Sequence, residues 1–205
     1  MLVKSLCKQF CPEKIPVQLG NLISGGADGE LFSIVNEPNK VIKLSVLFNR
    51  DERGIHNMYK QVQGVLDYII NTQQNAYVRI YEHGYLGSYS RHIAHWGEQE
   101  FIIHYHIMEK LLKLSEDENR IFHSILSHED NGIIKDFSLE KIKKMLLGMS
   151  RGLDFDVEKV ILFCSNIIAS VIIHNDIHPR NIMINNTDDY KLIDIDRCSL
   201  SIYTE

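Results

Sequence analysis

Polar side chains gather in one short stretch between apolar runs, at residues 171–184. The stretch holds His174, Asp176, His178 and Asn181, with isoleucines before and after them. A polar group that is buried without a partner costs about 1–3 kcal/mol. We therefore expect these side chains to have hydrogen-bond partners or a chemical role.

A second acidic point follows at Asp194 and Asp196, where the next apolar run ends. Asp176, Asn181 and Asp194 all offer oxygen atoms, which are the ligands that Mg²⁺ prefers. The alternative is that Asp176 and Asn181 form a turn beside Pro179, and that the later aspartates are exposed at the end of a strand. The residue types thus indicate a magnesium site or an ordinary turn.

The second half of the chain is predicted to position these residues on a helix and a small β-ribbon. Apolar residues at helical spacing predict a helix over residues 157–172, with Asp156 or Asp154 as its N-cap. Residues 182–185 and 190–195 are predicted strands, joined by a turn over residues 186–189. Acidic residues between residues 116 and 152 are expected to form a solvated face; they are Glu116, Asp117, Glu118, Glu129 and Asp130.

The first half is predicted to consist of strands around one helix. The helix runs from Asn49 or Asp51 to Asn71, because Ile55, Met58, Val62, Val65 and Ile69 recur at helical spacing. Residues 101–108 are a predicted buried strand on which His104 and His106 share one face. Residues 82–97, which contain glycine, histidine and serine, are predicted to be a loop. Further strands are expected at residues 22–23, 31–35, 40–44 and 76–81. The fold class is therefore α+β, with a β-rich lobe followed by a mainly helical one.

The polar stretch resembles a known family. His174-x-Asp176-x-x-x-x-Asn181, followed by Ile193-Asp194, is similar to the catalytic loop and metal-binding motif of the protein-kinase-like superfamily. Upstream, residues 23–32 look like a glycine loop that covers phosphates, and residues 41–43 look like the strand that carries the phosphate-binding lysine. Residues 107–111 resemble the hinge between kinase lobes. The resemblance covers residues 22–197.

The resemblance implies a two-lobed kinase-like fold, with an N-lobe at residues 1–108 and a reduced C-lobe at residues 109–205. It implies an ATP-dependent protein kinase, directed at serine or threonine, that uses Mg²⁺ or Mn²⁺. Asp176 would accept the proton of the acceptor hydroxyl, and Asn181 and Asp194 would bind the metal. Lys43 would hold the nucleotide phosphates, and His174 would be structural. The remaining nucleotide-binding residues would be Gly25, Gly26, Gly29, Met108 as gatekeeper, Glu109 and Leu111.

Several features depart from the kinase pattern. Glu52, the one glutamate between Asn49 and Asn71, lies earlier than the glutamate that usually pairs with the lysine. Asn175 replaces an arginine and Asp196 replaces a glycine, and both changes argue against switching by activation-loop phosphorylation. The sequence ends 11 residues after Asp194, as expected for a minimal, atypical kinase whose C-lobe needs an activating or stabilising protein partner.

Three alternatives stay open. His178-Pro179 resembles the loop of aminoglycoside- and choline-type phosphotransferases, which implies a small-molecule acceptor. The missing helix glutamate and the reduced C-lobe suggest a kinase-like binding module without catalysis. The spacing of His92 and His95, near His104 and His106, suggests a metal site instead.

Composition excludes several other classes of protein. The 205 residues are 24% charged with a net charge of −5, so the chain lacks the excess of lysine and arginine that general nucleic-acid binding needs. No apolar run approaches the roughly 18 residues of a membrane span, and the N-terminus lacks a secretory signal. Four scattered cysteines suggest reduced thiols. We expect a cytoplasmic protein, or one in the host-cell cytoplasm if the chain is viral or a secreted effector.

Overall fold

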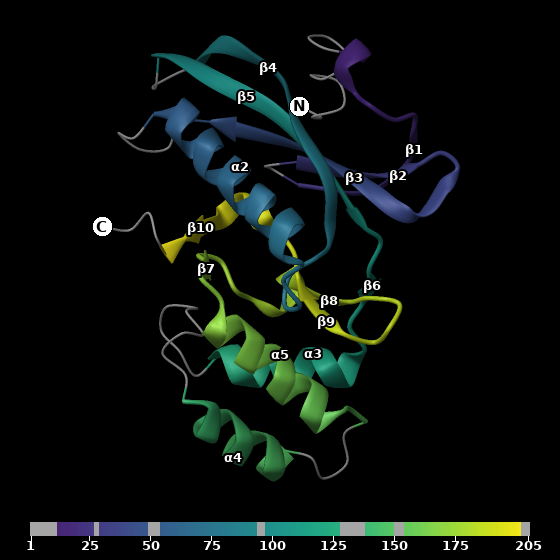
Figure 1. The fold of residues 1–205 in the computed structure, drawn as a ribbon, viewed down its shortest axis with the longest axis vertical. Helices are drawn as coiled ribbons and strands as arrows, with labels where there is room; N and C mark the ends of the chain where they lie inside the picture. The colour runs from purple at the N-terminus through teal and green to yellow at the C-terminus, as the bar shows by residue number, and fades with distance from the viewer. Residues whose placement is uncertain are drawn as a thin grey trace. The chain divides into compact units, whose positions relative to one another are not determined.

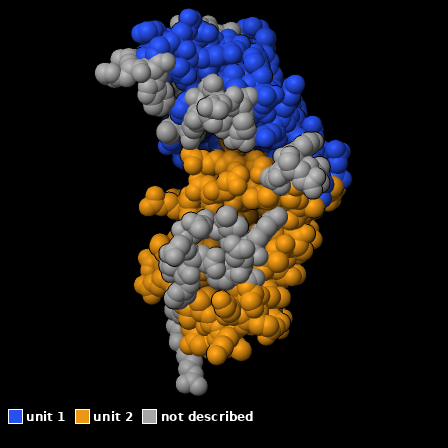
Figure 2. All heavy atoms as spheres, turned by 90° about the vertical axis from the view of Figure 1, so that its left-hand side faces the viewer, with its two compact units in different colours: residues 1–71, 79–110 blue, residues 72–78, 111–205 orange. Residues whose placement is uncertain are grey.

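The computed structural model describes residues 12–26, 29–48, 54–93, 97–127, 138–149 and 154–201. These residues form a mixed α+β protein with four α-helices and a β-rich sheet. Contacts divide the chain into two compact units, coloured separately in Figure 2. Unit 1 comprises residues 1–71 and 79–110, and unit 2 comprises residues 72–78 and 111–205. The chain passes from unit 1 to unit 2 for the last time after residue 110, two residues beyond the predicted lobe boundary. That the units are kinase lobes stays a prediction.

Unit 1 is built on a five-stranded antiparallel sheet in the order β1-β2-β3-β5-β4 (Figure 1). It follows a short 3₁₀ turn, η1 (Pro12–Lys14). The strands are β1 (Leu19–Gly25), β2 (Gly29–Ile34), β3 (Glu37–Phe48), β4 (Ile80–Ile93) and β5 (Gly97–Glu109). Since side chains alternate along a strand, Ile103, Tyr105 and Ile107 of β5 enter one apolar core with Phe32 and Leu44. His104 and His106 lie on the opposite face, as the sequence predicted, with ring centroids 6.4 Å apart.

The helix of unit 1 covers this histidine-bearing face. α2 (Ile55–Thr72) buries Ile55, Val62, Val65 and Ile69 of the apolar stripe that the sequence predicted. Met58 of that stripe is only partly buried, and Tyr59, which was not predicted, is buried beside it. The Tyr59 ring lies 5.7 Å from the His104 ring. The predicted caps at residues 49 and 51 lie outside the described residues.

Two predictions about the middle of the chain are wrong. Residues 82–97 were expected to form a loop, but most of them belong to β4, which pairs with β5 along its length. Small and polar residues hide its alternation, and pairing with the buried β5 decides its conformation. The strand expected at residues 76–81 is divided instead: Tyr77 bridges to Leu192 in unit 2, while β4 begins at Ile80 in unit 1.

Unit 2 combines three helices with two small sheets. The helices are α3 (Glu116–Ser127), α4 (Leu139–Met149) and α5 (Val157–Ala169), and α4 contacts the other two (Figure 1). β6 (Leu112–Lys113), β8 (Ile182–Ile184) and β9 (Tyr190–Leu192) form one sheet, and β7 (Ile172–His174) pairs with β10 (Cys198–Leu200) in the other. Two 3₁₀ turns, η3 (Pro179–Asn181) and η4 (Ile195–Arg197), connect them. None of the described helices combines the length and the apolar character that a membrane crossing requires.

The predicted helix start in unit 2 is confirmed, and its predicted end is wrong. Asp156 is the N-cap of α5, since its carboxylate accepts from the N–H groups of Glu158 and Lys159 at 3.0 and 3.1 Å. The helix ends at Ala169 rather than at residue 172, because β7 takes residues 172–174 into the sheet with β10.

Of the acidic residues expected to form a solvated face, Glu116 is exposed, whereas Glu118 is partly buried and has specific partners. Its Oε2 accepts from the Ser115 N–H at 2.8 Å, and the Ser115 hydroxyl accepts from the Glu118 N–H at 3.2 Å. This is a capping box at the start of α3. Oε1 of Glu118 also accepts from the Tyr190 hydroxyl at 2.8 Å, which ties α3 to β9. Two other acidic residues of that region, Glu129 and Asp130, lie outside the described residues.

The segment 72–78 belongs to unit 2 because it extends the β8–β9 hairpin. The Val78 N–H donates to the Leu192 carbonyl at 2.9 Å, and the Leu192 N–H donates to the Ala76 carbonyl at 2.8 Å. Tyr77 is buried, and its hydroxyl donates to the Ile172 carbonyl at the start of β7. One short segment therefore links both small sheets of unit 2.

Candidate functional site

The β8–β9 hairpin brings Asn181 and Asp194 to one end of the ribbon. At the turn, the Asn185 Oδ1 accepts from the Asp189 N–H at 2.8 Å, which fixes the hairpin register. Beyond the strands, the Ile193 N–H donates to the Asn181 carbonyl at 2.9 Å. Asn181 and Asp194 therefore leave the ribbon at the same end, although 12 residues separate them in the sequence.

Asp194 has a left-handed backbone conformation, with φ 64° and ψ 48°. Few residues other than glycine adopt this conformation; aspartate tolerates it better than most. Such conformations cluster at functional sites, where the surrounding structure holds them. A carboxylate stands at this position, where glycine would be less strained, and this favours a role for the charge.

Asn181 holds the loop that leads to it. The residue is buried, its Nδ2 donates to the Asp176 carbonyl at 2.9 Å, and its own N–H donates to the His178 carbonyl at 2.9 Å. Since the amide nitrogen is engaged in this way, Oδ1 is the atom that the side chain would offer to a cation.

His174 joins this loop to the end of β9. Its Nε2–H donates to the Ile193 carbonyl at 2.7 Å, and its Nδ1 accepts from the Asp176 N–H at 3.2 Å. The Ile193 carbonyl can only accept a hydrogen bond, and the Asp176 N–H can only donate one. His174 must therefore be the neutral tautomer that is protonated on Nε2. Burial lowers the pKa of His174, which also favours the neutral ring.

The lowered pKa of His174 predicts an acid-sensitive fold. In the unfolded chain the imidazole takes up a proton near pH 6.5, while the folded chain resists it. The unfolded state thus binds more protons, so this contribution to stability is complete above pH 6.5 and is lost as the pH falls towards the folded pKa. We expect the free energy of unfolding in urea to decrease between pH 7.5 and pH 5. The decrease should be smaller in His174→Gln, and equal slopes in both proteins would contradict the prediction.

One cation lies close to both carboxylates of the site. Nη1 of Arg197 is 3.2 Å from the Asp176 Oδ2, and Nε of the same arginine is 4.0 Å from the Asp194 Oδ2. Nε2 of His178 is 3.9 Å from the other Asp176 oxygen. Asp176 and Asp194 are 33% and 27% exposed, so solvent and a ligand can reach them. Arg197 was not predicted as a site residue; the local sequence shows only that a basic residue stands three positions after Asp194.

The donor set at this end of the ribbon fits a hard divalent cation. It comprises the partly exposed carboxylate of Asp194 and the amide oxygen of Asn181, held by a hydrogen-bonded loop. Oxygen ligands of this kind suit Mg²⁺ and Mn²⁺. Asp176 stands beside this pair without needing to be a ligand, since its contacts are to Arg197 and His178.

In unit 1, the glycine turn lies beside Lys43. The Gly26 N–H donates to the Gly29 carbonyl at 2.9 Å between β1 and β2. Gly29 pairs with Ser45 of β3, and a Cβ at Gly29 would lie 2.7 Å from the Leu44 carbonyl oxygen and 3.4 Å from Cε of Lys43. The fold therefore requires glycine at position 29 and sets the turn next to the lysine side chain.

The two glycines of this turn predict different effects of an added methyl group. Gly29→Ala must displace the β3 backbone, so we expect it to lower the free energy of unfolding by about 1–3 kcal/mol. A Cβ at Gly26 meets nothing within 4 Å, so Gly26→Ala should change stability by less than about 0.5 kcal/mol. Urea denaturation of both variants checks the difference, and similar losses in both would contradict it.

The predicted hinge residues end β5 and begin unit 2. Met108 is buried on β5, and Glu109 holds the start of β4, because its N–H donates to the Arg79 carbonyl and its Oε1 accepts from the Arg79 N–H at 2.8 Å. Leu111 is the residue at which the chain passes from unit 1 into unit 2 for the last time. A role for Met108, Glu109 and Leu111 in nucleotide binding stays a prediction.

The structure does not bring all the predicted residues together. His92 pairs with Glu98 on the β4–β5 hairpin, whereas His104 pairs with Tyr85. Seven residues of extended strand separate these positions, about 23 Å at 3.3 Å per residue, so the four-histidine metal site is wrong. His95, its fourth member, and Glu52, the candidate partner of Lys43, lie outside the described residues.

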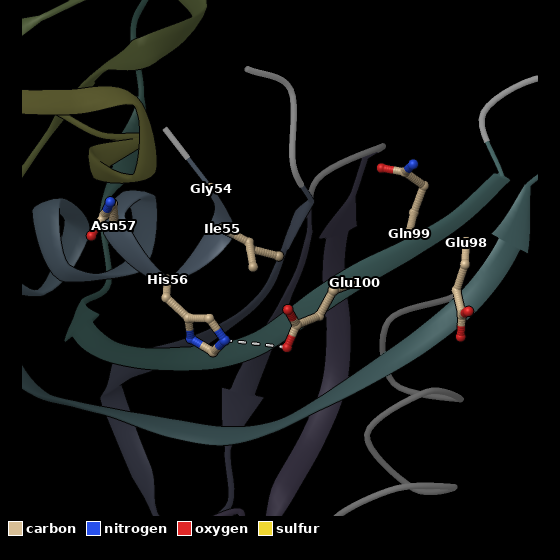
Figure 3. A pocket seen from close by; sticks show the side chains of 7 residues that line it. All are labelled: Gly54, Ile55, His56, Asn57, Glu98, Gln99 and Glu100. Atoms are coloured by element: carbon tan, nitrogen blue, oxygen red, sulfur yellow. Dashed lines mark ion pairs between the residues drawn. The ribbon is translucent and has the colours of Figure 1, made fainter. Parts of the chain in front are cut away.

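A polar hollow of about 380 Å³ in unit 1 was not predicted. It is lined by the start of α2 (residues 54–57) and by residues 98–100 of β5 (Figure 3). Nε2 of His56 lies 3.3 Å from Oε1 of Glu100, and the His56 side chain is 66% exposed. None of the residues predicted to carry chemistry lines this hollow, and its lining is mainly polar apart from the buried Ile55.

Comparisons with known proteins give little further information. No protein family and no curated protein matches the sequence. A solved structure described as WbdD in a co-crystal with the kinase inhibitor LY294002 is similar over 91% of this chain, at 12% identity and a TM-score of 0.42. This chain spans about a third (34%) of that chain's length.

Proposed function

We propose that this chain is an ATP-dependent phosphotransferase with a kinase-like fold, which transfers the γ-phosphoryl group to a hydroxyl group. One observation carries the proposal: His174 and the β8–β9 hairpin hold Asp176, Asn181 and Asp194 in one hydrogen-bonded group, in which both carboxylates are partly exposed. Phosphoryl transfer needs mainly positioning and charge neutralisation, which such a group supplies.

Each residue has a separate task in the proposed reaction. Asp176 accepts the proton of the acceptor hydroxyl as the new O–P bond forms and the bond to ADP breaks. Asn181 and Asp194 are the residues that would hold Mg²⁺ or Mn²⁺, and the metal, when bound, offsets the charge of the phosphates. His174 keeps the loop closed without taking part in the proton transfer.

Unit 1 would contribute the nucleotide contacts. The ammonium group of Lys43 would neutralise the α- and β-phosphates. The backbone at Gly25 and Gly26 would approach the nucleotide. The space around these two glycines is open to a ligand: only the Glu30 side chain lies within 4 Å of a Cβ placed at Gly25, and nothing does at Gly26. Met108, Glu109 and Leu111 would contact the base.

The acceptor that we place first is a serine or threonine hydroxyl of a protein. A small-molecule acceptor is the second candidate, and the position of His178 favours it. In conventional serine/threonine kinases a lysine stands two residues after the catalytic aspartate, and here His178 lies 3.9 Å from the Asp176 carboxylate. A protein partner for unit 2 would be a requirement of the first candidate.

The experiment is transfer of label from γ-labelled ATP by the purified chain with Mg²⁺ or Mn²⁺. Acceptors are the chain itself, a generic basic protein, and a panel of aminoglycosides and choline, with Asp194→Asn run in parallel. Label on protein that disappears in the variant supports a protein kinase, and label on a small molecule supports the second candidate. Absence of both label and nucleotide-dependent thermal stabilisation would contradict the enzyme and favour a non-catalytic binding module.

A further inference from the structure

Arg197 lies in the candidate site, and the proposed reaction gives it no role. Its guanidinium lies within 4.0 Å of both Asp176 and Asp194. The side chain is 42% exposed, so the contact is not forced by burial. A single cation thus neutralises the carboxylate proposed to accept a proton and the one proposed to hold the metal.

The backbone holds Arg197 in this position independently of its side chain. The Arg197 N–H donates to the Asp194 carbonyl at 3.3 Å within η4, and the Arg197 carbonyl accepts from Nδ2 of Asn175 at 2.9 Å. The next residue, Cys198, pairs with His174 across β7 and β10. The fold therefore presents this arginine to the two aspartates by contacts that a side-chain substitution leaves intact.

A guanidinium and a divalent cation compete at such a place. Both are attracted to the Asp194 carboxylate, and they repel each other when they occupy neighbouring positions. Binding of a metal therefore requires the arginine to move away or weakens the metal's affinity. A neutral side chain at position 197 would remove this competition and leave two carboxylates that repel each other, which also favours a metal.

We propose that Arg197 is a counter-cation that occupies the space between Asp176 and Asp194 until a divalent metal displaces it. It is a positioning residue, since it acts through the two aspartates. Arg197 raises the metal concentration at which the site is filled. Until the metal binds, it also prevents other cations from binding to Asp176 and Asp194. The inference rests on the proposed function, because it assumes that Asp194 holds a metal.

The test is a titration of the full chain with Mn²⁺, in which the free ion is measured by its electron paramagnetic resonance signal. Arg197→Gln should bind Mn²⁺ about three- to tenfold more tightly than the natural chain, a range typical of removing one partly exposed charge at this distance. Arg197→Lys keeps the charge and should stay within about twofold of the natural chain. Arg180→Gln removes an exposed charge next to Asn181 and should also stay within about twofold.

The outcomes separate this inference from the proposed function. Equal or weaker binding by Arg197→Gln, with binding lost in Asp194→Asn, would overturn the counter-cation while the metal site stands. Failure of both Arg197→Gln and the natural chain to bind Mn²⁺ would overturn the counter-cation and the metal site together. If Arg197→Gln unfolds, Arg197→Met and the circular dichroism of each variant replace it, since the backbone contacts at position 197 stay in place.

Discussion

Asp176→Asn is expected to slow phosphoryl transfer about 10²–10⁴-fold, the usual contribution of a general base. The amide keeps the shape of the side chain but cannot accept the proton of the acceptor hydroxyl. The loop should stay intact, because it is held through the backbone of Asp176: its N–H donates to His174 and its carbonyl accepts from Asn181. The measurement is the initial rate of γ-label transfer at saturating ATP, together with the melting temperature.

A matched control separates the base from the general loss of a charge. Asp188→Asn removes a carboxylate from the exposed β8–β9 turn of the same unit, at a left-handed position that asparagine also tolerates. Its transfer rate should equal that of the natural chain. The role of Asp176 is contradicted if Asp176→Asn retains more than about a third of the natural rate with an unchanged melting temperature.

The sequence predicted those parts of the fold whose cause is local. The apolar stripe of α2, the N-cap at Asp156 and the two strands of the β8–β9 hairpin follow from spacing and turn residues within a few positions. The capping box of Ser115 and Glu118 was equally readable, because serine followed three residues later by glutamate is its signature.

Other features depend on partners that are distant in the sequence. Tyr77 leaves the expected strand because it pairs with Leu192, and β4 is extended because it pairs with the buried β5. Local composition favours a loop at β4, and only the sheet overrides it. Spacing alone does not indicate these pairings.

The candidate site divides in the same way. Asp176, Asn181 and Asp194 were singled out by residue type and spacing, and the hydrogen bonds of His174 and Asn181 give them a common framework. Arg197 was missed, since its meaning depends on the pairing of β10 with β7, which returns the chain to His174. The sequence shows an arginine after two aspartates, and the fold shows which carboxylates it meets.

Asp194→Asn is expected to weaken metal-dependent nucleotide binding about a hundredfold and to reduce phosphoryl transfer at least about a hundredfold. Stabilisation by a ligand grows as RT ln(1 + [L]/Kd), so a ligand at a hundred times its Kd contributes about 2.7 kcal/mol. A Kd that is a hundredfold weaker reduces this contribution to about 0.4 kcal/mol. Thermal unfolding with ATP and Mg²⁺, compared with ATP and a chelator, measures the difference.

The choice of substitution separates the charge of Asp194 from its backbone conformation. Asparagine tolerates the left-handed conformation at this position, whereas alanine adds strain of about 1–2 kcal/mol. Asp194→Asn should therefore keep the melting temperature of the ligand-free chain and lose the Mg²⁺-dependent shift. Asp194→Ala should have a lower melting temperature without ligand and should also lose the Mg²⁺-dependent shift. Asp194→Gly relieves the strain and should behave like the asparagine variant towards the metal. Asp194→Asn removes only the charge of this carboxylate. A Mg²⁺-dependent shift of natural size in this variant would therefore mean that the metal binds elsewhere.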